Sequence, residues 1–159
     1  MTTLHLENHN TLISYQDATL DQISCHYLLS QLADSFPTLQ ACYRVLRPGG
    51  ILKIQDDLNC HYPRAADYID TIYQMLNPTH NHLLTDDELR GVLLDSGFEI
   101  ITFQKKKKIQ IAQNTPYQEK IRLLLCLAPQ PVQQFLSPID GDKLTFHCYE
   151  VHITAKKPL

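Results

Sequence analysis

The sequence predicts an α/β domain with a mostly parallel sheet, and three neighbouring segments carry this prediction. Residues 21–25 read as a short buried strand that runs out into a polar loop. A helix follows, because apolar residues from Leu39 to Leu46 recur at the spacing of one helical face. Residues 47–50, Arg-Pro-Gly-Gly, stop this helix and turn the chain into a second strand, residues 51–55. A strand, a helix and a strand joined in this way form a βαβ unit, which implies parallel pairing and a right-handed crossover.

Shorter signals place further elements around this unit. Residues 3–6 predict a short strand before it, and residues 64–76 predict a helix after it. Residues 85–88, Thr-Asp-Asp-Glu, form a capping box that opens the next helix, and Gly97 takes the position that follows the end of that helix. The alternation of strands and helices therefore continues on both sides of the unit.

The last part of the chain adds two strands. Residues 98–103 predict a strand that runs into four lysines, residues 105–108. Alternate lysines would point to opposite faces, so the run favours a solvated strand end, whose charge discourages edge pairing, over a continuous basic face for phosphate or nucleic acid. The Thr-Pro pair at residues 115–116 opens another helix, Asp140-Gly141 marks a turn, and residues 144–155 predict the final strand.

Composition limits the function classes. The chain has 159 residues, enough for one compact domain, and its net charge of -3 argues against a nucleic-acid-binding surface. It has no apolar run long enough to cross a bilayer and no signal-peptide pattern, so we expect a cytoplasmic protein that contacts no membrane. No CxxC occurs among the cysteines, and no ligand cluster accompanies the close pair His80 and His82. We therefore expect no metal site.

Five segments resemble, in order and spacing, the motifs of one known family. Residues 17–23 (Asp-Ala-Thr-Leu-Asp-Gln-Ile) resemble D-x-S-F-D-x-V, and residues 44–52 (Arg-Val-Leu-Arg-Pro-Gly-Gly-Ile-Leu) resemble R-V-L-K-P-G-G-x-L. Residues 78–89 are similar to D-P-S-H followed by T-x-x-E-L, residues 94–99 to L-x-x-A-G-F, and residues 153–158 to the ending A-x-K-P. The chain thus resembles class I S-adenosylmethionine (SAM)-dependent methyltransferases of the ubiquinone/menaquinone-biosynthesis type over nearly its whole length.

The resemblance implies a truncated Rossmann-like SAM methyltransferase fold that retains strands 4-5-7-6 with flanking helices, in a single domain covering the whole chain. Residues 21–25 and 51–55 would be the fourth and fifth strands of that fold. Residues 98–103 would be the sixth strand, and residues 144–155 the antiparallel seventh. The segment at the start of the chain would lie near the family's third strand.

The same resemblance implies that the cofactor half is missing. In the family, a glycine-rich turn after the first strand lets the backbone approach SAM, but no glycine precedes Gly49 here. The acidic residue beside the adenine would fall at His9 or Asn10. At the end of the fourth strand, this chain has His26, Ser30 and Gln31 where the family often has an arginine and a pair of histidines. His9, Asn10 and His26 are therefore the altered cofactor-facing positions, and we expect SAM to bind only where a partner completes the site.

Two residues are candidates for catalysis. His80 matches the family's P-S-H histidine and is either a general base or a loop histidine, and Asp56 at the end of the fifth strand is either an active-site acid or an Asx-type cap. His26 likewise is either ligand-facing or a loop residue. Together with Tyr62, His80 and Asp56 would line the old acceptor cavity.

A sheet cut before its fourth strand would leave residues 21–25, with Ile23, as an exposed apolar edge and would leave apolar surface bare. We therefore expect a homodimer or a second protein chain that pairs at this strand. Three functions remain open: a dimeric binding or scaffold module without independent transferase activity, an active methyltransferase completed by a partner chain or dimer, and a small-molecule binder or non-methylating enzyme using the old acceptor cavity.

Overall fold

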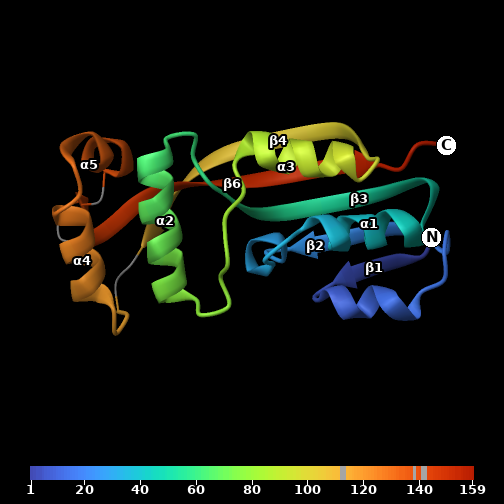
Figure 1. Cartoon of the computed structure of the whole chain (residues 1–159), viewed down its shortest axis with the longest axis horizontal. Helices are drawn as coiled ribbons and strands as arrows, with labels where there is room; N and C mark the ends of the chain where they lie inside the picture. The colour runs from blue at the N-terminus through green and yellow to red at the C-terminus, as the bar shows by residue number, and fades with distance from the viewer. Residues whose placement is uncertain (112–113, 138, 141–142) are drawn as a thin grey trace.

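The computed structural model describes the chain from Met1 to Leu159 except residues 112–113, 138 and 141–142. Strands and helices alternate along most of the chain (Figure 1). Its elements are β1 (Thr3–Leu6), η1 (His9–Ser14), β2 (Leu20–His26), η2 (Leu29–Gln31), α1 (Phe36–Val45), β3 (Leu46–Leu58), α2 (Pro63–Leu76), α3 (Asp86–Asp95), β4 (Glu99–Ile111), α4 (Gln118–Cys126), α5 (Gln130–Leu136), β5 (Ile139–Asp140) and β6 (Lys143–Lys156).

The strand order confirms the predicted Rossmann-like arrangement. The main path of the sheet runs β1-β2-β3-β6-β4, with β5 paired to β6 off this path. β1, β2 and β3 are parallel, whereas β6 is inserted antiparallel between β3 and β4. The path β2-β3-β6-β4 is therefore the predicted order 4-5-7-6, with the last strand of the chain antiparallel to both neighbours.

β2 is not an edge of the sheet, so the expectation of an exposed strand at residues 21–25 is wrong. β1 pairs with it in parallel register from Thr3 opposite Gln22 to Leu6 opposite Cys25, and Ile23 is fully buried. The position beside the fourth strand is the one that doubly wound sheets give to their first strand. Here residues 3–6, which the sequence resemblance assigned near the third strand, occupy it.

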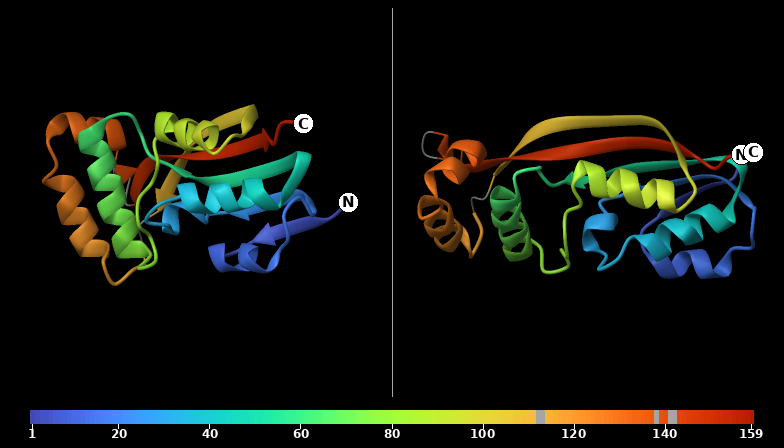
Figure 2. Two further views of the ribbon diagram at one scale, coloured as in Figure 1. Left: turned by 45° about the vertical axis from the view of Figure 1, so that its right-hand side comes forward. Right: turned by 45° about the horizontal axis from the view of Figure 1, so that its top comes forward.

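The helices α1 and α3, together with η1, cover one face of the sheet (Figure 2). In the part of the chain that the structure describes, the opposite face is uncovered around Lys53, Gln55 and His152, whereas further along β6 the side chains of the same parity, Phe146 and Cys148, pack against α2, α4 and α5. The covered face is apolar, with Leu52 and Ile54 of β3 buried beneath the helices. The uncovered face is polar, because the alternate residues Lys53 and Gln55 point away from the helices. The uncovered part of the sheet around Lys53 and Gln55 therefore presents polar side chains to solvent.

A second apolar cluster forms at the other end of β6. There α2, α4 and α5 pack against Leu144, Phe146 and Cys148. Tyr149, the next residue of β6, packs against this cluster and also against the cluster beneath α1 and α3. β6 therefore runs through both clusters and connects them.

β4 is longer than predicted, because the strand continues through the lysine run instead of ending before it. All four lysines pair with β6, from Lys105 opposite Val151 to Lys108 opposite Cys148. Their alternation is confirmed. The ammonium of Lys105 lies 3.6 Å from Asp86 at the start of α3, whereas Lys108 pairs with Asp57.

Local signals explain the helix ends. Thr85 and Glu88 form both hydrogen bonds of the predicted capping box, and Gly97 has a left-handed φ of 93° after α3. The sequence did not predict α5, a seven-residue helix. The turn predicted at Asp140-Gly141 includes Gly141, which lies outside the described residues.

Candidate functional site

A cavity lies at the carboxyl ends of β1 and β2, the edge at which open α/β sheets bind their ligands. Its volume is about 390 Å³, and His26 is one of its walls. The hydroxyl of Ser24 is hydrogen-bonded to Nδ1 of His5 across the two strands at 2.6 Å. The lining residues are His5, Leu6, Glu7, Ser24, His26, Tyr27, Leu28 and Gln31.

Tyr27 connects this edge to the uncovered face. Its φ of 51° is in the left-handed region, which a bulky residue rarely adopts. The phenol donates a 2.6 Å hydrogen bond to Glu150 and accepts one from the amide of Gln55 at 3.1 Å. The same carboxylate accepts a 2.7 Å hydrogen bond from Nε2 of His152.

The charges around Glu150 are arranged to keep it ionised. The hydrogen bond from Tyr27 is the largest cause that lowers the pKa of Glu150. Burial, the second cause, opposes it, but the hydrogen bond from His152 and the charge of Lys108 add to the lowering and bring the pKa to about 2. Burial and the Glu150 carboxylate raise the pKa of Tyr27. The phenol therefore stays a hydrogen-bond donor at neutral pH, and Glu150 fixes the orientation of both the phenol and the imidazole.

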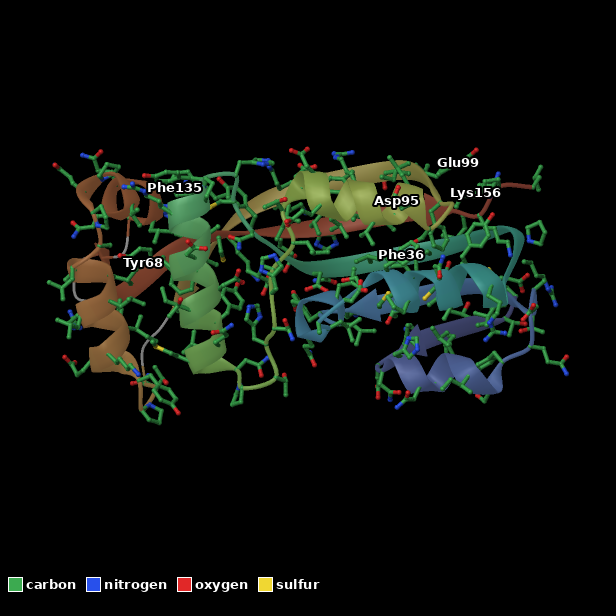
Figure 3. All side chains as sticks on the ribbon, viewed as in Figure 1. Phe36, Tyr68, Asp95, Glu99, Phe135 and Lys156 are labelled. Atoms are coloured by element: carbon green, nitrogen blue, oxygen red, sulfur yellow. The ribbon has the colours of Figure 1, made fainter. Side chains whose placement is uncertain are left out.

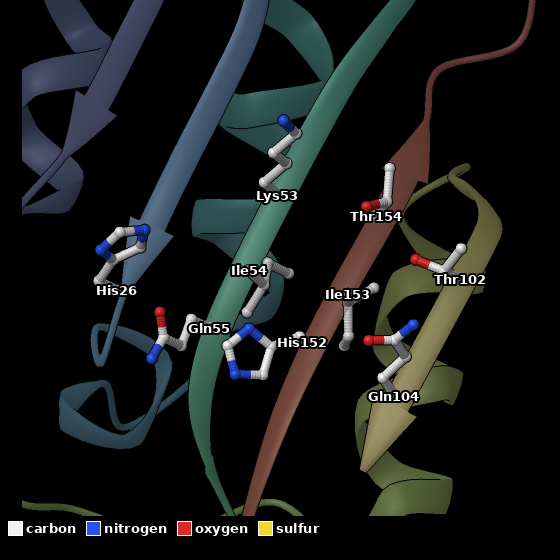
Figure 4. Close-up of a pocket in the computed structure, with 9 residues that line it drawn as sticks. All are labelled: His26, Lys53, Ile54, Gln55, Thr102, Gln104, His152, Ile153 and Thr154. Carbon is white, nitrogen blue, oxygen red and sulfur yellow. The ribbon is translucent and has the colours of Figure 1, made fainter. Parts of the chain in front are cut away.

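The side chains of the uncovered face form a second, shallower cavity of about 330 Å³, which Figure 4 views with the helices behind the sheet. Four of its residues form one row across β2, β3, β6 and β4, as cross-strand neighbours: His26, Gln55, His152 and Gln104. Lys53 lies in the adjacent row, and its ammonium forms no ion pair with any described residue. His26 is thus shared between the two cavities.

Asp56 is buried, and its carboxylate connects β3 to the loop after β2 by hydrogen bonds. One carboxylate oxygen accepts hydrogen bonds from the backbone N–H groups of Leu29 at 2.8 Å and Ser30 at 3.4 Å, and the other accepts from the N–H of Asp57 at 2.8 Å. Burial raises the pKa of Asp56 to about 6, and the side-chain hydrogen bond from Ser30, followed by the backbone hydrogen bonds, partly offsets this rise. Asp56 therefore anchors the loop after β2 to the end of β3.

His80 belongs to a different cluster, centred on Asp70 of α2. Nε2 of His80 donates to one oxygen of Asp70 at 3.0 Å, and Nδ1 of His82 is 2.9 Å from the other oxygen. Burial acts to raise the pKa of Asp70, but the hydrogen bonds from His80, Leu83 and His82 outweigh it and lower the pKa. The His80 side chain is only 1% exposed, so its imidazole fixes the loop between α2 and α3 rather than facing solvent.

The structure does not bring the sequence-predicted residues into one site. His9 and Asn10 lie in η1, where Nδ1 of His9 is 3.0 Å from the hydroxyl of Thr38 in α1, away from both cavities that contain His26. Tyr62 lines a separate cavity near α5, and neither His80 nor Asp56 is among the residues that line it.

Sequence reasoning missed Glu7, Tyr27, Glu150 and His152. Glu7 and Tyr27 directly follow β1 and β2, and ligand-binding residues of open α/β sheets commonly lie at the carboxyl ends of parallel strands. Glu150 and His152 carried a weaker signal, which is their spacing of two in a strand that places both side chains on one face.

The family model for a methyltransferase domain matches residues 3–102 of this chain. The chain belongs to the methyltransferase-domain family. A Mycolicibacterium smegmatis protein described as a probable S-adenosylmethionine-dependent methyltransferase is 30% identical over 84 residues, which are 53% of this chain and 30% of that protein. The chain therefore matches less than a third of the length of this curated relative.

Two solved structures share the fold. A candidate methyltransferase from Bacillus halodurans has a TM-score of 0.84 at 16% identity, with 92% of this chain and 73% of that chain covered. The YcgJ protein from Bacillus subtilis has a TM-score of 0.80 at 16% identity, with 92% and 67% covered. At this level of identity the likeness shows the arrangement of strands and helices.

Methyltransferase homologues imply SAM as the family cofactor, but the residues after β1 do not fit it. Instead of a glycine-rich turn, the chain continues through Glu7 and Asn8 into η1, and the Asn8 side chain accepts a 3.2 Å hydrogen bond from the N–H of Thr11. The side-chain cap occupies the place at which a glycine turn would bring the backbone close to the ligand.

Two further findings concern the described residues. No group of three or more histidine, cysteine, aspartate or glutamate side chains within them is arranged to hold a metal ion. None of their helices is both long enough and apolar enough to cross a membrane.

Proposed function

We propose that this methyltransferase-family chain has no transferase activity on its own and acts as a binding module. The observation that carries the proposal is the segment after β1, where Asn8 caps η1 and no glycine is present. SAM needs backbone N–H groups at close range in this fold, and a side-chain-capped turn withholds them. We also propose that the chain derives from the ubiquinone/menaquinone-biosynthesis type of methyltransferase, on the sequence motifs it retains.

Calorimetric titration with SAM tests this proposal. We expect no saturable heat at SAM concentrations up to the millimolar range, and no transfer of labelled methyl groups by the chain alone. Tight one-to-one binding of SAM would overturn the proposal. If heat is observed, the His26→Ala variant locates it, because a ligand in the β1–β2 cavity would contact this imidazole.

The polar uncovered face favours this function over an enzyme completed by a partner. In a doubly wound sheet, helices cover both faces, and the strands are apolar on both. A partner that supplied those helices would have to bury Lys53, Gln55 and His152, and burying an unpaired ammonium is costly. SAM bound with the help of such a partner therefore ranks second.

A partner of another kind stays part of the proposal. We retain a second copy of the chain, or another protein, as the partner of the binding module, although β2 cannot be its docking strand because β1 and β3 pair with both of its sides. Size-exclusion chromatography with light scattering measures this directly. A mass of twice 18.3 kDa supports the homodimer, and a mass of 18.3 kDa across the concentration range excludes it.

A further inference from the structure

The cavity beside Tyr62 lies where the two apolar clusters meet. Tyr149 packs against both clusters and forms one wall, and the cavity has a volume of about 350 Å³. Junctions between packed units are common places for small-molecule sites, and this volume is in the range of such sites. Its walls come from four parts of the chain: His61 and Tyr62 before α2, Lys105 of β4, Phe135 of α5 and Tyr149 of β6.

Three aromatic rings dominate the walls. Tyr62 and Phe135 meet edge to face, with ring centroids 5.7 Å apart, and Tyr149 contributes the third ring. Figure 3 shows Phe135 close to the end of α2 at which Tyr62 precedes the helix. All three rings are only partly buried, so each retains surface that a ligand can cover. Aromatic rings pair favourably in stacked or edge-to-face geometry, which suits a flat aromatic ligand.

Apart from the hydroxyls of Tyr62 and Tyr149, the polar side chains that line the cavity are basic. The Lys105 ammonium lies 5.2 Å from the centroid of Tyr149, and His61 is exposed at the rim. The nearest carboxylate to Lys105, Asp86 at 3.6 Å, already accepts a 2.5 Å hydrogen bond from Arg90. One carboxylate thus faces two cations, which leaves an excess positive charge beside the rings, and none of the lining residues is acidic.

We propose that this cavity binds a planar aromatic molecule carrying an acidic group, such as a carboxylate or a phenolate. The ring lies among Tyr62, Phe135 and Tyr149, and the anionic group is placed at Lys105. The excess positive charge attracts an anion and repels a cation of the same shape. This inference is independent of the proposed loss of SAM binding, because the cavity shares no residue with the cavity at the ends of β1 and β2.

Binding of 2-naphthoate tests the ring and the charge together. The chain contains no tryptophan, so the fluorescence anisotropy of the naphthalene group can be followed with little protein background. We expect saturable one-to-one binding of 2-naphthoate, at least tenfold weaker binding of the neutral 2-naphthalenemethanol, and no measurable binding of 2-naphthylmethylammonium.

Variants assign the binding to this cavity. Lys105→Met keeps the aliphatic stem and removes the charge, and it should weaken 2-naphthoate binding at least tenfold. Lys106→Met is the matched control, because this lysine is one residue further along β4 on the opposite face, and it should change binding less than twofold. Phe135→Leu removes one ring with little loss of volume and should weaken binding severalfold, and thermal unfolding of each variant checks that it is folded.

The inference is overturned if 2-naphthoate shows no saturable binding to the wild-type chain. It is equally overturned if Lys105→Met and Lys106→Met bind 2-naphthoate alike, or if the ammonium analogue binds as tightly as the carboxylate. A SAM titration of the same sample tests the proposed loss of SAM binding separately, so either proposal can fail while the other holds.

Discussion

Replacing Asp56 by asparagine should change how the stability of the protein depends on pH. Burial raises the pKa of Asp56 from the ordinary 3.8 to about 6 in the folded state, although three backbone N–H groups donate to its carboxylate. The folded protein therefore holds this proton more tightly than the unfolded chain does. Since the folded-state pKa is the higher one, the contribution of Asp56 to stability is fully present below pH 3.8 and is lost as the pH rises through 6.

The size of the loss follows from the two pKa values. Each step of one in pKa corresponds to about 1.4 kcal/mol, so the rise from 3.8 to about 6 corresponds to about 3 kcal/mol in full. About 2.4 kcal/mol of this is lost between pH 4 and pH 7, because at pH 4 the unfolded carboxyl is already more than half ionised. Asparagine has no such proton. In the variant, the amide NH₂ replaces one carboxylate oxygen, so a backbone N–H that this oxygen accepted from is left without an acceptor. This loss should lower the free energy of unfolding by about 1–3 kcal/mol at every pH.

Urea unfolding of wild type and Asp56→Asn at half-unit steps from pH 4 to pH 7 measures the difference. The variant should be less stable than wild type at pH 4 by about 1–3 kcal/mol, and the difference should shift by about 2.4 kcal/mol in favour of the variant by pH 7. The difference between the two proteins cancels the pH dependence of all other groups. Asp95→Asn is the control for the substitution itself, because Asp95 is exposed at the end of α3 (Figure 3), and its variant should stay within about 0.5 kcal/mol of wild type. A gap that stays constant from pH 4 to pH 7 would refute the reasoning.

Three further substitutions test local features by urea unfolding at pH 7. Thr85→Ala removes the hydroxyl that accepts from the N–H of Glu88 in the capping box and should cost about 1 kcal/mol; an unchanged midpoint would contradict the role of the cap. Gly97→Ala places a Cβ 3.0 Å from the Tyr43 ring at a φ of 93° and should cost about 1–3 kcal/mol. Gly91→Ala, in the middle of α3 with open space around the new Cβ, should instead stabilise the protein by up to about 1 kcal/mol. If both glycine variants moved in the same direction, space and φ would not be the deciding factors.

The sequence predicted those parts of the fold in which local signals agree. The helix α1 and the strand β3 follow from apolar spacing, a proline and glycines within about 20 residues of each other, and the capping box of α3 needs only four residues. The turn predicted at residues 47–50 is wrong, because β3 already begins at Leu46. The order of the last four strands came from the family resemblance, because strand pairing between distant segments leaves no local pattern.

The structure differs from the sequence-based prediction where contacts with distant parts of the chain determine the secondary structure. Lysine has a low preference for strands, so residues 105–108 read as the end of β4. In the structure they continue it, because β6 pairs with them throughout and Asp57 and Asp86 neutralise two of the ammonium groups. α5 has no side-chain cap and is held by burial of Val132 and Leu136 in the second apolar cluster.

The candidate site was predicted less well than the fold, because a residue at a strand end can turn either towards a ligand or towards the backbone. Asp56 and His80 were identified as polar residues in the right places, and both point to internal hydrogen-bond partners. His26 follows the same positional rule and does line cavities. Two of the three N–H donors to the carboxylate of Asp56 belong to Leu29 and Ser30 after β2, far from Asp56 in sequence, so no local pattern placed them.

The alternation of polar and apolar residues in the sequence indicates the uncovered face of the sheet. This face helps to distinguish a binding module from an enzyme completed by a partner. In β3 the apolar Leu52 and Ile54 alternate with Lys53 and Gln55, and β6 shows the same period of two around His152. Such alternation is typical of a sheet with one face in water, whereas parallel strands covered on both faces are apolar throughout. A partner that covered this face with helices would need an apolar surface to bury, whereas around Lys53, Gln55 and His152 the face is polar.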